Sequence, residues 1–562
     1  MILKRSFLAT FIFFTISFNC LGQGKLDTVV ILHNGIELPD TWPPRYSENK
    51  VRESMPVPYL KNKPEIISIN VGRQLFVDDF LIQETNLDPQ YHNATYYKGN
   101  PVLEPDQEWE KTFEGAPYAA PFSDGIWYDE SDNKFKMWYL AGAGSLYPEK
   151  QTFYTGYAES LDGKSWKKIN TDVYEGTNIV DTANRDAATI WLDKEEKDKS
   201  KRFKMFVVER RNTDKRWQYV LKYSPDGIHW SNGVAQSGDM YDRSTVFFNP
   251  FTKKWVLSMR YNAEVGRSRS YLEHADPEMA VSLAHRIRKD VNDKFTVFWF
   301  TPDDKEPHHP KFDSIQPQIY NHDAIAYESI MLGYFNVWQG PENSEAAKLG
   351  IQKRNEILMG YSRDGFHWSR PSHNVFMGVN ETDSAWNWGN VQSIGGVPII
   401  KGDSLYFYVS GRRLNNIMWD GYTSTGLATL RRDGFVSLNS TNKNGYLLTR
   451  KLEFDGEYLF VNANIANKGE LRVEVLDENG NLVEGYSKAE SIPMKENSTK
   501  YQLKWKGSKS LSDFKNRPVK LKFYLSKGEL YSFWISKWET GESRGFTAGG
   551  GPGLSPTGID VR

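Results

Sequence analysis

The sequence has almost no cysteine. Its single cysteine, Cys20, lies near the N-terminus of a chain of 562 residues. The folded part of the chain therefore has no disulfide framework and no thiol chemistry.

An excess of one charge is also absent. Lys and Arg total 70 and Asp and Glu total 71, which leaves a formal net charge of −1. Nucleic-acid-binding domains usually carry a basic surface or net positive charge. The composition therefore gives no reason to expect nucleic acid as a partner.

Long hydrophobic runs are missing as well. The apolar run over residues 7–18 follows Lys4 and Arg5. It is shorter than the twenty or so residues that a spanning helix needs, and its pattern is typical of a secretory signal. We expect a signal peptide over residues 1–23 and export to the periplasm or the medium. Cys20 lies in the cleavage region, so an outer-membrane lipoprotein with a lipid anchor at Cys20 is the alternative.

Aromatic residues, by contrast, are abundant, at 14% of the chain. In β-proteins they pack between sheets, and in carbohydrate-binding proteins they stack on sugar rings. The composition leaves both uses open.

A turn motif with Asp recurs at nearly even spacing. Asp162, Asp226 and Asp364 each begin an Asp-Gly turn that is followed by Trp, Asp433 begins a shorter copy, and Asp293 begins a degenerate one. The spacings are 64, 67, 71 and 69 residues. Asp-Gly between apolar runs indicates a tight turn between strands, and regular recurrence indicates radially repeated sheets. The sequence therefore predicts an all-β fold that contains a five-bladed β-propeller.

The composition changes after Leu447. Residues 471–476 and 519–525 alternate apolar and polar side chains, which indicates strands with one buried face and predicts a C-terminal β-sandwich. The Gly-rich end has little apolar content, so we expect it to be loose. The predicted organisation is a signal peptide over 1–23, an extended lead-in over 24–70, a catalytic propeller over 71–448, a β-sandwich over 449–540 and a flexible tail over 541–562.

Three carboxylates mark the predicted starts of innermost strands. In a propeller these starts converge on the central axis. Counting back from the turns assigns Asp186, Asp242 and Asp323 to the starts of blades two, three and four. Glycoside hydrolysis needs two carboxyl groups, one protonated and one charged. We therefore predict these residues as catalytic, with a strand-capping role for each as the alternative.

A group of mostly basic and aromatic side chains is predicted at the same face. Arginine suits the recognition of carboxylate or sulfate groups, so the group predicts an anionic ligand. The alternative is that these arginines pair with neighbouring Asp and Glu residues. The predicted substrate-binding residues are Arg185, Glu209, Arg210, Arg243, Arg260, His322, Trp388 and Arg412.

Two further candidates are set aside. Glu328 falls at the turn where an innermost strand reverses, on the opposite face, so we expect a structural role. His308 and His309 lack the spaced carboxylates or cysteines of a metal site. We expect no metal and no cofactor.

The repeat pattern and several motifs resemble those of glycoside hydrolase family 32 and its relatives in families 43, 62, 68 and 117. Arg185-Asp186-Ala187 is similar to the Arg-Asp-Pro motif of family 32, whose Asp stabilises the transition state, and Asp242 stands where that family has its third-blade acid. The family's blade-one motif appears only as residues 119–125, without the nucleophilic Asp. The chain looks most like family-32-like proteins of polysaccharide-degrading bacteria, which implies a five-bladed propeller followed by a β-sandwich.

Three functions follow as hypotheses. The first is an exported glycosidase that acts on a uronate-bearing or sulfated polysaccharide or its oligosaccharides by paired-carboxylate catalysis. The second is a glycan-binding propeller without activity, favoured by the missing blade-one Asp. The third is a polysaccharide lyase, for which Tyr241 and His322 are available as bases.

Overall fold

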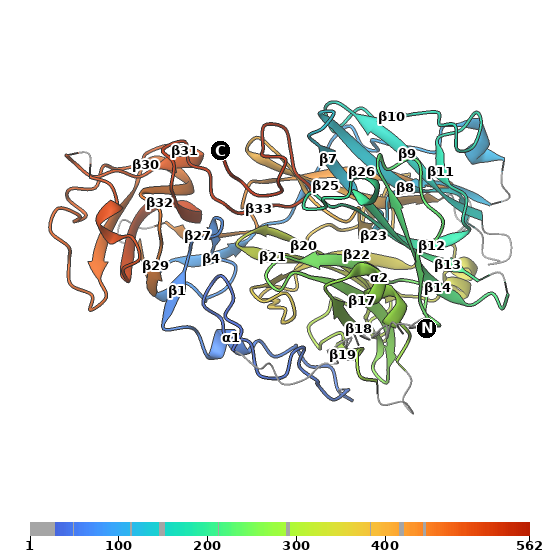
Figure 1. Cartoon of the computed structure of the whole chain (residues 1–562), viewed down its shortest axis with the longest axis horizontal. Coiled ribbons are helices and arrows are strands. Elements are labelled where there is room, and N and C mark those ends of the chain that lie inside the picture. The colour runs from blue at the N-terminus through green and yellow to red at the C-terminus, as the bar shows by residue number, and fades with distance from the viewer. Residues whose placement is uncertain are drawn as a thin grey trace, which may run out of the picture.

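The computed structural model describes residues 29–562, except 49, 113–114, 145–151, 212, 288–292, 383, 415–420, 442–444 and 508. The predicted signal peptide and Cys20 lie outside these residues. The described part is nearly all β, as predicted (Figure 1). None of its helices is long and apolar enough to cross a membrane. The α-helices in this part are α1 (Pro58–Lys61), α2 (Pro277–Leu283) and α3 (Asn343–Leu349).

Three four-stranded antiparallel sheets follow one another along the middle of the chain. The third of them takes its fourth strand from the C-terminal tail. The first contains β12 (Arg185–Leu192), β13 (Phe203–Arg210), β14 (Trp217–Ser224) and β15 (Ala235–Gln236). The second contains β16 (Thr245–Asn249), β17 (Lys254–Ala263), β18 (Gly266–His274) and β19 (Val297–Phe300). The third contains β20 (Gln318–Glu328), β21 (Ile330–Gly340), β22 (Arg354–Ser362) and β33 (Phe546–Thr547).

Two more antiparallel meanders join in one eleven-stranded sheet, where β6 and β26 pair in parallel at Tyr118 and Thr423. The first meander contains β6 (Ala116–Ala120), β7 (Ile126–Asp129), β8 (Lys134–Gly144), β9 (Thr152–Ser160), β10 (Lys167–Lys168) and β11 (Ile179–Asp181). The last contains β23 (Val391–Ile394), β24 (Ile399–Lys401), β25 (Ser404–Leu414), β26 (Gly421–Arg431) and the early strand β5 (Thr95–Tyr96). The chain thus forms five consecutive meanders. Their arrangement as five blades of one propeller stays a prediction.

The recurring Asp makes the same local turn in four of its five copies. At Asp162, Asp226, Asp293 and Asp364 the carboxylate accepts hydrogen bonds of 2.7–2.9 Å from the backbone N–H groups two and three residues later. Such Asx turns use only local contacts, so the motif predicts them well. Asp433 differs, since it is buried among arginines (see below).

The C-terminal sheet is larger than predicted. Figure 1 shows the early strands β1 and β4 beside the late strands β30 and β32 at one end of the molecule. β27 and β28 also belong to this sheet, so it begins before the predicted boundary at residue 448. β5 pairs with β26 and belongs to the last meander, not to this sheet. Two packed layers stay a prediction. The strands are β1 (Ile66–Ser68), β2 (Gln74–Leu75), β3 (Ile82–Thr85), β4 (Asp88–Tyr91), β27 (Val436–Ser440), β28 (Gly445–Thr449), β29 (Lys451–Glu453), β30 (Tyr458–Asp477), β31 (Asn497–Gln502) and β32 (Val519–Ser536).

The C-terminal tail is packed, not loose as the sequence suggested. β33 pairs with the end of β20, and the carbonyl of Gly549 accepts a hydrogen bond of 2.9 Å from the backbone of Tyr128. A Cβ on Gly551 would lie 1.8 Å from the carbonyl oxygen of Ile400. The glycines therefore permit a close backbone approach that larger residues would block.

Candidate functional site

Asp186 lies at an irregularity near the start of β12. The register between β12 and β13 shifts between Arg185 and Ala188, and such bulges redirect side chains beside functional sites. The Asp186 side chain is 19% exposed and forms an ion pair of 2.9 Å with Arg243. The guanidinium of Arg243 in turn stacks 4.6 Å from the ring centre of Phe122.

Asp242 precedes β16 and pairs with Arg260 of β17 at 2.5 Å. Burial raises the pKa of Asp186 and the charge of Asp242 raises it further, against the effect of Arg243. Burial also acts to raise the pKa of Asp242, but Arg260 and Arg243 outweigh it and lower that pKa. The two carboxyl groups therefore have the opposite tendencies that acid and base roles require.

Tyr320 lies at a second irregularity, in β20. The register with β21 shifts between Ile319 and Asn321. The ammonium group of Lys353 lies 3.3 Å from the Tyr320 hydroxyl, and the guanidinium of Arg267 lies 5.3 Å from its ring centre. Burial acts to raise the pKa of Tyr320, but the nearby cations outweigh it and lower the pKa to about 8. Tyr320 was not among the predicted site residues, because one Tyr among 30 has no distinctive signal in the sequence.

Arg412 and Lys353 add two buried cations. Arg412 of β25 is 4% exposed; it donates a hydrogen bond of 3.1 Å to Gln392 and lies 5.7 Å from the ring centre of Tyr118. Lys353 is 7% exposed, and burial together with the charge of Arg412 lowers its pKa, against the effect of Tyr320.

Together these residues form what we call the cationic cluster. Among the residues described here it has five cationic side chains and two carboxylates, with Glu342 at its rim, 3.7 Å from Arg267. The cluster therefore has an excess of positive charge, although the whole chain is close to neutral. Its members are Asp186, Asp242, Arg243, Arg260, Arg267, Tyr320, Lys353 and Arg412.

Asp323 does not lie at a strand start as predicted, because it is the sixth residue of β20. Thr245 donates its hydroxyl hydrogen to the carbonyl of His322, which sets Asp323 one residue beyond the level of Thr245. Asp242 instead precedes β16 by three residues, so it does not lie level with Asp323. The count failed because β20 begins early, at Gln318. Burial raises the pKa of Asp323 to about 7, against the effect of Ser123.

Arg185 does not reach the cluster as a ligand-binding group. It is 1% exposed, and its guanidinium makes a two-pronged ion pair with the buried Asp124, at 3.1 and 2.5 Å. For Arg185 the alternative interpretation applies, in which the arginine pairs with a neighbouring acid and not with a ligand.

Four other predicted residues lie outside the contacts of the cluster. The ring of His322 is buried between Trp299 and Phe335, at 5.1 and 4.7 Å. Glu209 is half-buried near Lys222, and burial raises its pKa. Arg210 is exposed and stacks 4.5 Å from the ring centre of Trp217. Trp388 is half-buried and packs against Ala346 together with Ile351. Ile351 is two residues before Lys353 in the sequence.

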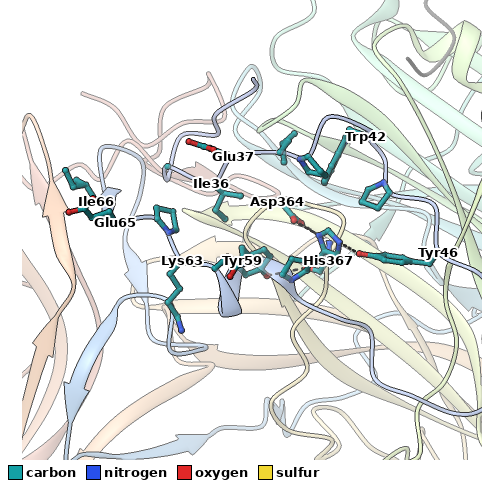
Figure 2. Close-up of a pocket in the computed structure, with 17 residues that line it drawn as sticks. Ile36, Glu37, Trp42, Tyr46, Tyr59, Lys63, Glu65, Ile66, Asp364 and His367 are labelled. Carbon is teal, nitrogen blue, oxygen red and sulfur yellow. Dashed lines mark hydrogen bonds and ion pairs between the residues drawn. The ribbon is translucent and has the colours of Figure 1, made fainter. Parts of the chain in front are cut away.

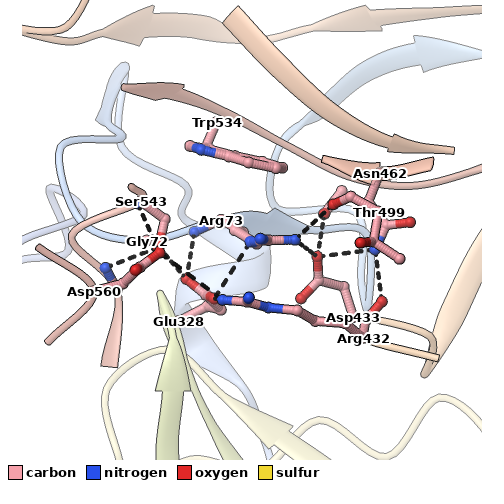
Figure 3. Close-up of polar contacts among 12 residues, drawn as sticks. Gly72, Arg73, Glu328, Arg432, Asp433, Asn462, Thr499, Trp534, Ser543 and Asp560 are labelled. Carbon is pink, nitrogen blue, oxygen red and sulfur yellow. Dashed lines mark hydrogen bonds and ion pairs between the residues drawn. The ribbon is translucent and has the colours of Figure 1, made fainter. Parts of the chain in front are cut away.

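Glu328 lies at the opposite end of β20 in a second charged group, which we call the ion-pair cluster (Figure 3). Its guanidinium and carboxylate contacts are Arg73–Glu328 at 3.4 Å, Arg73–Asp433 at 3.0 Å and Arg432–Glu328 at 3.1 Å. Asp560 of the tail lies 3.8 Å from Arg432. These contacts join the meanders, the C-terminal sheet and the tail, which agrees with a structural role for Glu328.

A cavity of about 740 Å³ lies under the N-terminal lead-in (Figure 2). On its wall the hydroxyl of Tyr46 lies 2.7 Å from Nε2 of His367, and Nδ1 of His367 lies 2.7 Å from Asp364. The same His–Asp contact recurs at His229 and Asp226, where it is exposed. The pair is therefore a property of the repeated turn and does not mark this cavity as a reaction site.

One group in the described part has the geometry to hold a metal ion. Ligand atoms of Asp303, Glu306 and His373 lie within 4.8 Å of one another. Arg370 already binds both oxygens of Glu306, at 2.5 and 2.8 Å, and His373 lies 2.9 Å from Asp303. Because these contacts already pair the charges of the group, we assign it a structural role.

No protein-family model matches the sequence, and no curated protein matches it. Solved structures to which this chain is similar include a glycosyl hydrolase from Bacteroides ovatus, at 12% sequence identity over 64% of this chain and 97% of that one, with a TM-score of 0.39. They also include a β-1,2-mannobiose phosphorylase from Listeria innocua, at 12% identity over 60% of this chain and 97% of that one, with a TM-score of 0.38. A third is a β-fructofuranosidase from Schwanniomyces occidentalis, at 10% identity over 79% of this chain and 96% of that one, with a TM-score of 0.37. These neighbours are glycan-processing enzymes, but similarity at this level carries no argument about the activity of this chain.

Proposed function

We propose that the chain is a glycosidase that acts on an anionic poly- or oligosaccharide at the cationic cluster. The observation that supports the proposal is the charge of that cluster, where among the described residues five cationic side chains accompany Asp186, Asp242 and the rim residue Glu342. Buried cations are costly unless an anion lies nearby. A carboxylate or sulfate group on the sugar would provide that anion.

Asp186 and Asp242 supply the two states of a hydrolytic pair. Asp186, whose pKa burial raises, is the proton donor to the glycosidic oxygen. Asp242, which Arg260 keeps charged, is the ionised partner that favours the positive charge developing on the sugar ring. We keep Arg243, Arg260 and Arg412 as substrate-binding residues, and set Arg185 and His322 aside because their surroundings hold them elsewhere.

The test is a screen of the purified protein against uronate-bearing and sulfated fragments, each beside its carboxyl-reduced or desulfated analogue. New reducing ends from the charged fragments, and few or none from the neutral analogues, would support the proposal. Products with an unsaturated, ultraviolet-absorbing uronate would identify a lyase. Binding without any product would identify a glycan-binding propeller, and both outcomes would overturn the proposed hydrolysis.

Export is part of the same proposal. Extracellular polysaccharides are available to an exported protein, and the predicted signal over residues 1–23 would provide export. Fractionation of the producing cells, with Cys20→Ser as the test of a lipid anchor, checks this. Release of the variant from the membrane fraction would support the lipoprotein alternative, and an unchanged soluble fraction would exclude it.

A further inference from the structure

Tyr320 and Lys353 form a pair that the acid–base assignment above does not use. The ammonium group of Lys353 is buried and lies 3.3 Å from the phenolic oxygen. Within the described residues no carboxylate forms an ion pair with Lys353, and the nearby groups that act on its pKa are Tyr320, Arg412 and Arg267. A buried ammonium group without a carboxylate partner favours negative charge on the oxygen beside it.

The charges that act on Tyr320 come from residues on or next to three other strands, β16, β18 and β22, the last of which Lys353 directly precedes. Arg243 precedes β16 and Arg267 lies on β18, and both act with Lys353 to favour the phenolate, while Asp242 opposes them. The net effect lowers the pKa of Tyr320 to about 8. About a tenth of the molecules then carry the phenolate at pH 7, compared with about a thousandth for an ordinary Tyr of pKa ~10.

Tyr320 and the proposed acid Asp186 share an interaction with Arg243. Both lie at register shifts of strands, Asp186 pairs with Arg243 at 2.9 Å, and the charge of Arg243 acts on the pKa of Tyr320. In the first meander, Ala119 and Ala120 at the end of β6 are fully buried apolar residues and offer no carboxylate at these two positions. Tyr320 of β20, beside the ammonium group of Lys353, is available as a nucleophile from another strand.

We infer that Tyr320 is the nucleophile of this glycosidase, with Lys353 holding its phenolate, and that the enzyme retains the anomeric configuration. The inference rests on the proposed function. It names a catalytic residue and a reaction course for the same site, and it assigns the substrate's anionic group to the remaining cations of the cluster.

The steps balance as two displacements at the anomeric carbon. First, the phenolate oxygen of Tyr320 bonds to that carbon, the glycosidic C–O bond breaks, and the Asp186 carboxyl group gives its proton to the leaving oxygen. Second, water attacks the same carbon, its proton passes to the Asp186 carboxylate, and the phenolate leaves. Asp242 stays ionised throughout and stabilises the positive charge on the ring.

The first test needs no substrate. Ultraviolet absorbance of tyrosinate is titrated in the wild type and in Tyr320→Phe, and the difference reports Tyr320 alone. We expect one phenol with a pKa of about 8. Lys353→Met should move this ionisation to higher pH, and Lys353→Arg, which keeps the charge, should leave it near 8. A difference curve that shows no ionisation below about pH 9.5 would overturn the inference.

The second test uses the fragment that yields reducing ends in the screen. Proton NMR of the first-formed product should show retained anomeric configuration, and Tyr320→Phe should lower kcat on the order of a thousandfold. Tyr446→Phe is the matched control, because the Tyr446 hydroxyl pairs with Glu84 in the C-terminal sheet. Inversion, or a fully active Tyr320→Phe variant, would overturn the inference and leave the proposed function intact. Absence of reducing ends from every fragment would instead overturn the proposed function.

Discussion

Strand β20 carries a charged cluster at each end, and the two clusters differ in charge balance. Tyr320 near its start belongs to the cationic cluster, and Glu328 at its end belongs to the ion-pair cluster, about 26 Å away at ~3.3 Å per residue. Counted in the same way among the described residues, the cationic cluster has five cationic side chains for three carboxylates, the third being Glu342 at its rim. The ion-pair cluster has Arg73 and Arg432 facing three carboxylates.

The carboxylates of the ion-pair cluster also receive hydrogen bonds from neutral groups. Glu328 accepts from the hydroxyl of Ser543 at 2.6 Å and from the backbone of Arg73 at 3.1 Å, and Asp433 accepts from Ser532 at 2.6 Å. The ion-pair cluster is buried, the cationic cluster is partly buried, and both contain shifted pKa values. Burial and pKa shifts alone therefore do not separate a structural cluster from a ligand site. The balance of charge does.

The largest effect is expected at Asp186. Asp186→Asn removes the proposed proton donor and should lower turnover on the order of a hundredfold or more, since acid–base catalysis contributes ~10²–10⁴-fold. Steady-state kinetics on the charged fragment measures this. Asp172→Asn, on an exposed side chain, is the matched control and should be fully active. A loss smaller than about tenfold would mean that Asp186 only orients Arg243.

Glu328→Gln should act on stability and leave the chemistry unaffected. It leaves the buried Arg73 and Arg432 without one of their carboxylates, and breaking a buried ion pair typically costs ~3–5 kcal/mol. Urea unfolding followed by fluorescence measures the change in the free energy of unfolding. The folded variant should keep its turnover. An unchanged unfolding midpoint together with lost turnover would reverse the roles of the two clusters.

Asp323 lies between the clusters and should make stability depend on pH. Its pKa of about 7 in the folded state exceeds the value of ~3.9 in unfolded chains, so the folded state holds a proton that the unfolded state has lost. Stability should therefore fall as pH rises from about 4 to 7, by about 2–3 kcal/mol between pH 5 and pH 8. Urea unfolding at these two pH values measures the fall, which Asp323→Asn should abolish. An equal fall in the variant would assign it to other groups.

The smallest effect is expected at Arg412. Arg412→Gln should weaken binding of a charged fragment by about tenfold, because a hydrogen bond to a charged group contributes ~1.5–3 kcal/mol. Binding of the neutral analogue should change much less. Calorimetry with both fragments measures the difference, and Arg413→Gln, at the neighbouring residue that contacts Tyr422, is the matched control. Equal losses for both fragments would make Arg412 structural.

The sequence alone predicted what depends on local contacts. The Asx turns at Asp162 and Asp293 involve residues two and three positions apart, so even a degenerate copy could be recognised. Alternation of apolar residues predicted the strands of β30 and β32, because the period of two is a property of each strand. Asp186, Asp242 and their arginines were predicted as site residues from residue type and from position relative to these turns, and their role stays a prediction.

Only the tertiary structure decided what depends on distant partners. Arg185 forms its ion pair with Asp124, 61 residues earlier in the sequence, and is not available to a ligand. Asp323 lies inside β20 because that strand begins early, at Gln318. The Gly-rich tail is packed because β33 pairs with the end of β20. The character of Tyr320 is set by Arg243, Arg267 and Lys353, which come from three other elements. Electrostatic effects act through space over several ångströms, so residues far apart in the sequence give a common side chain an uncommon chemistry.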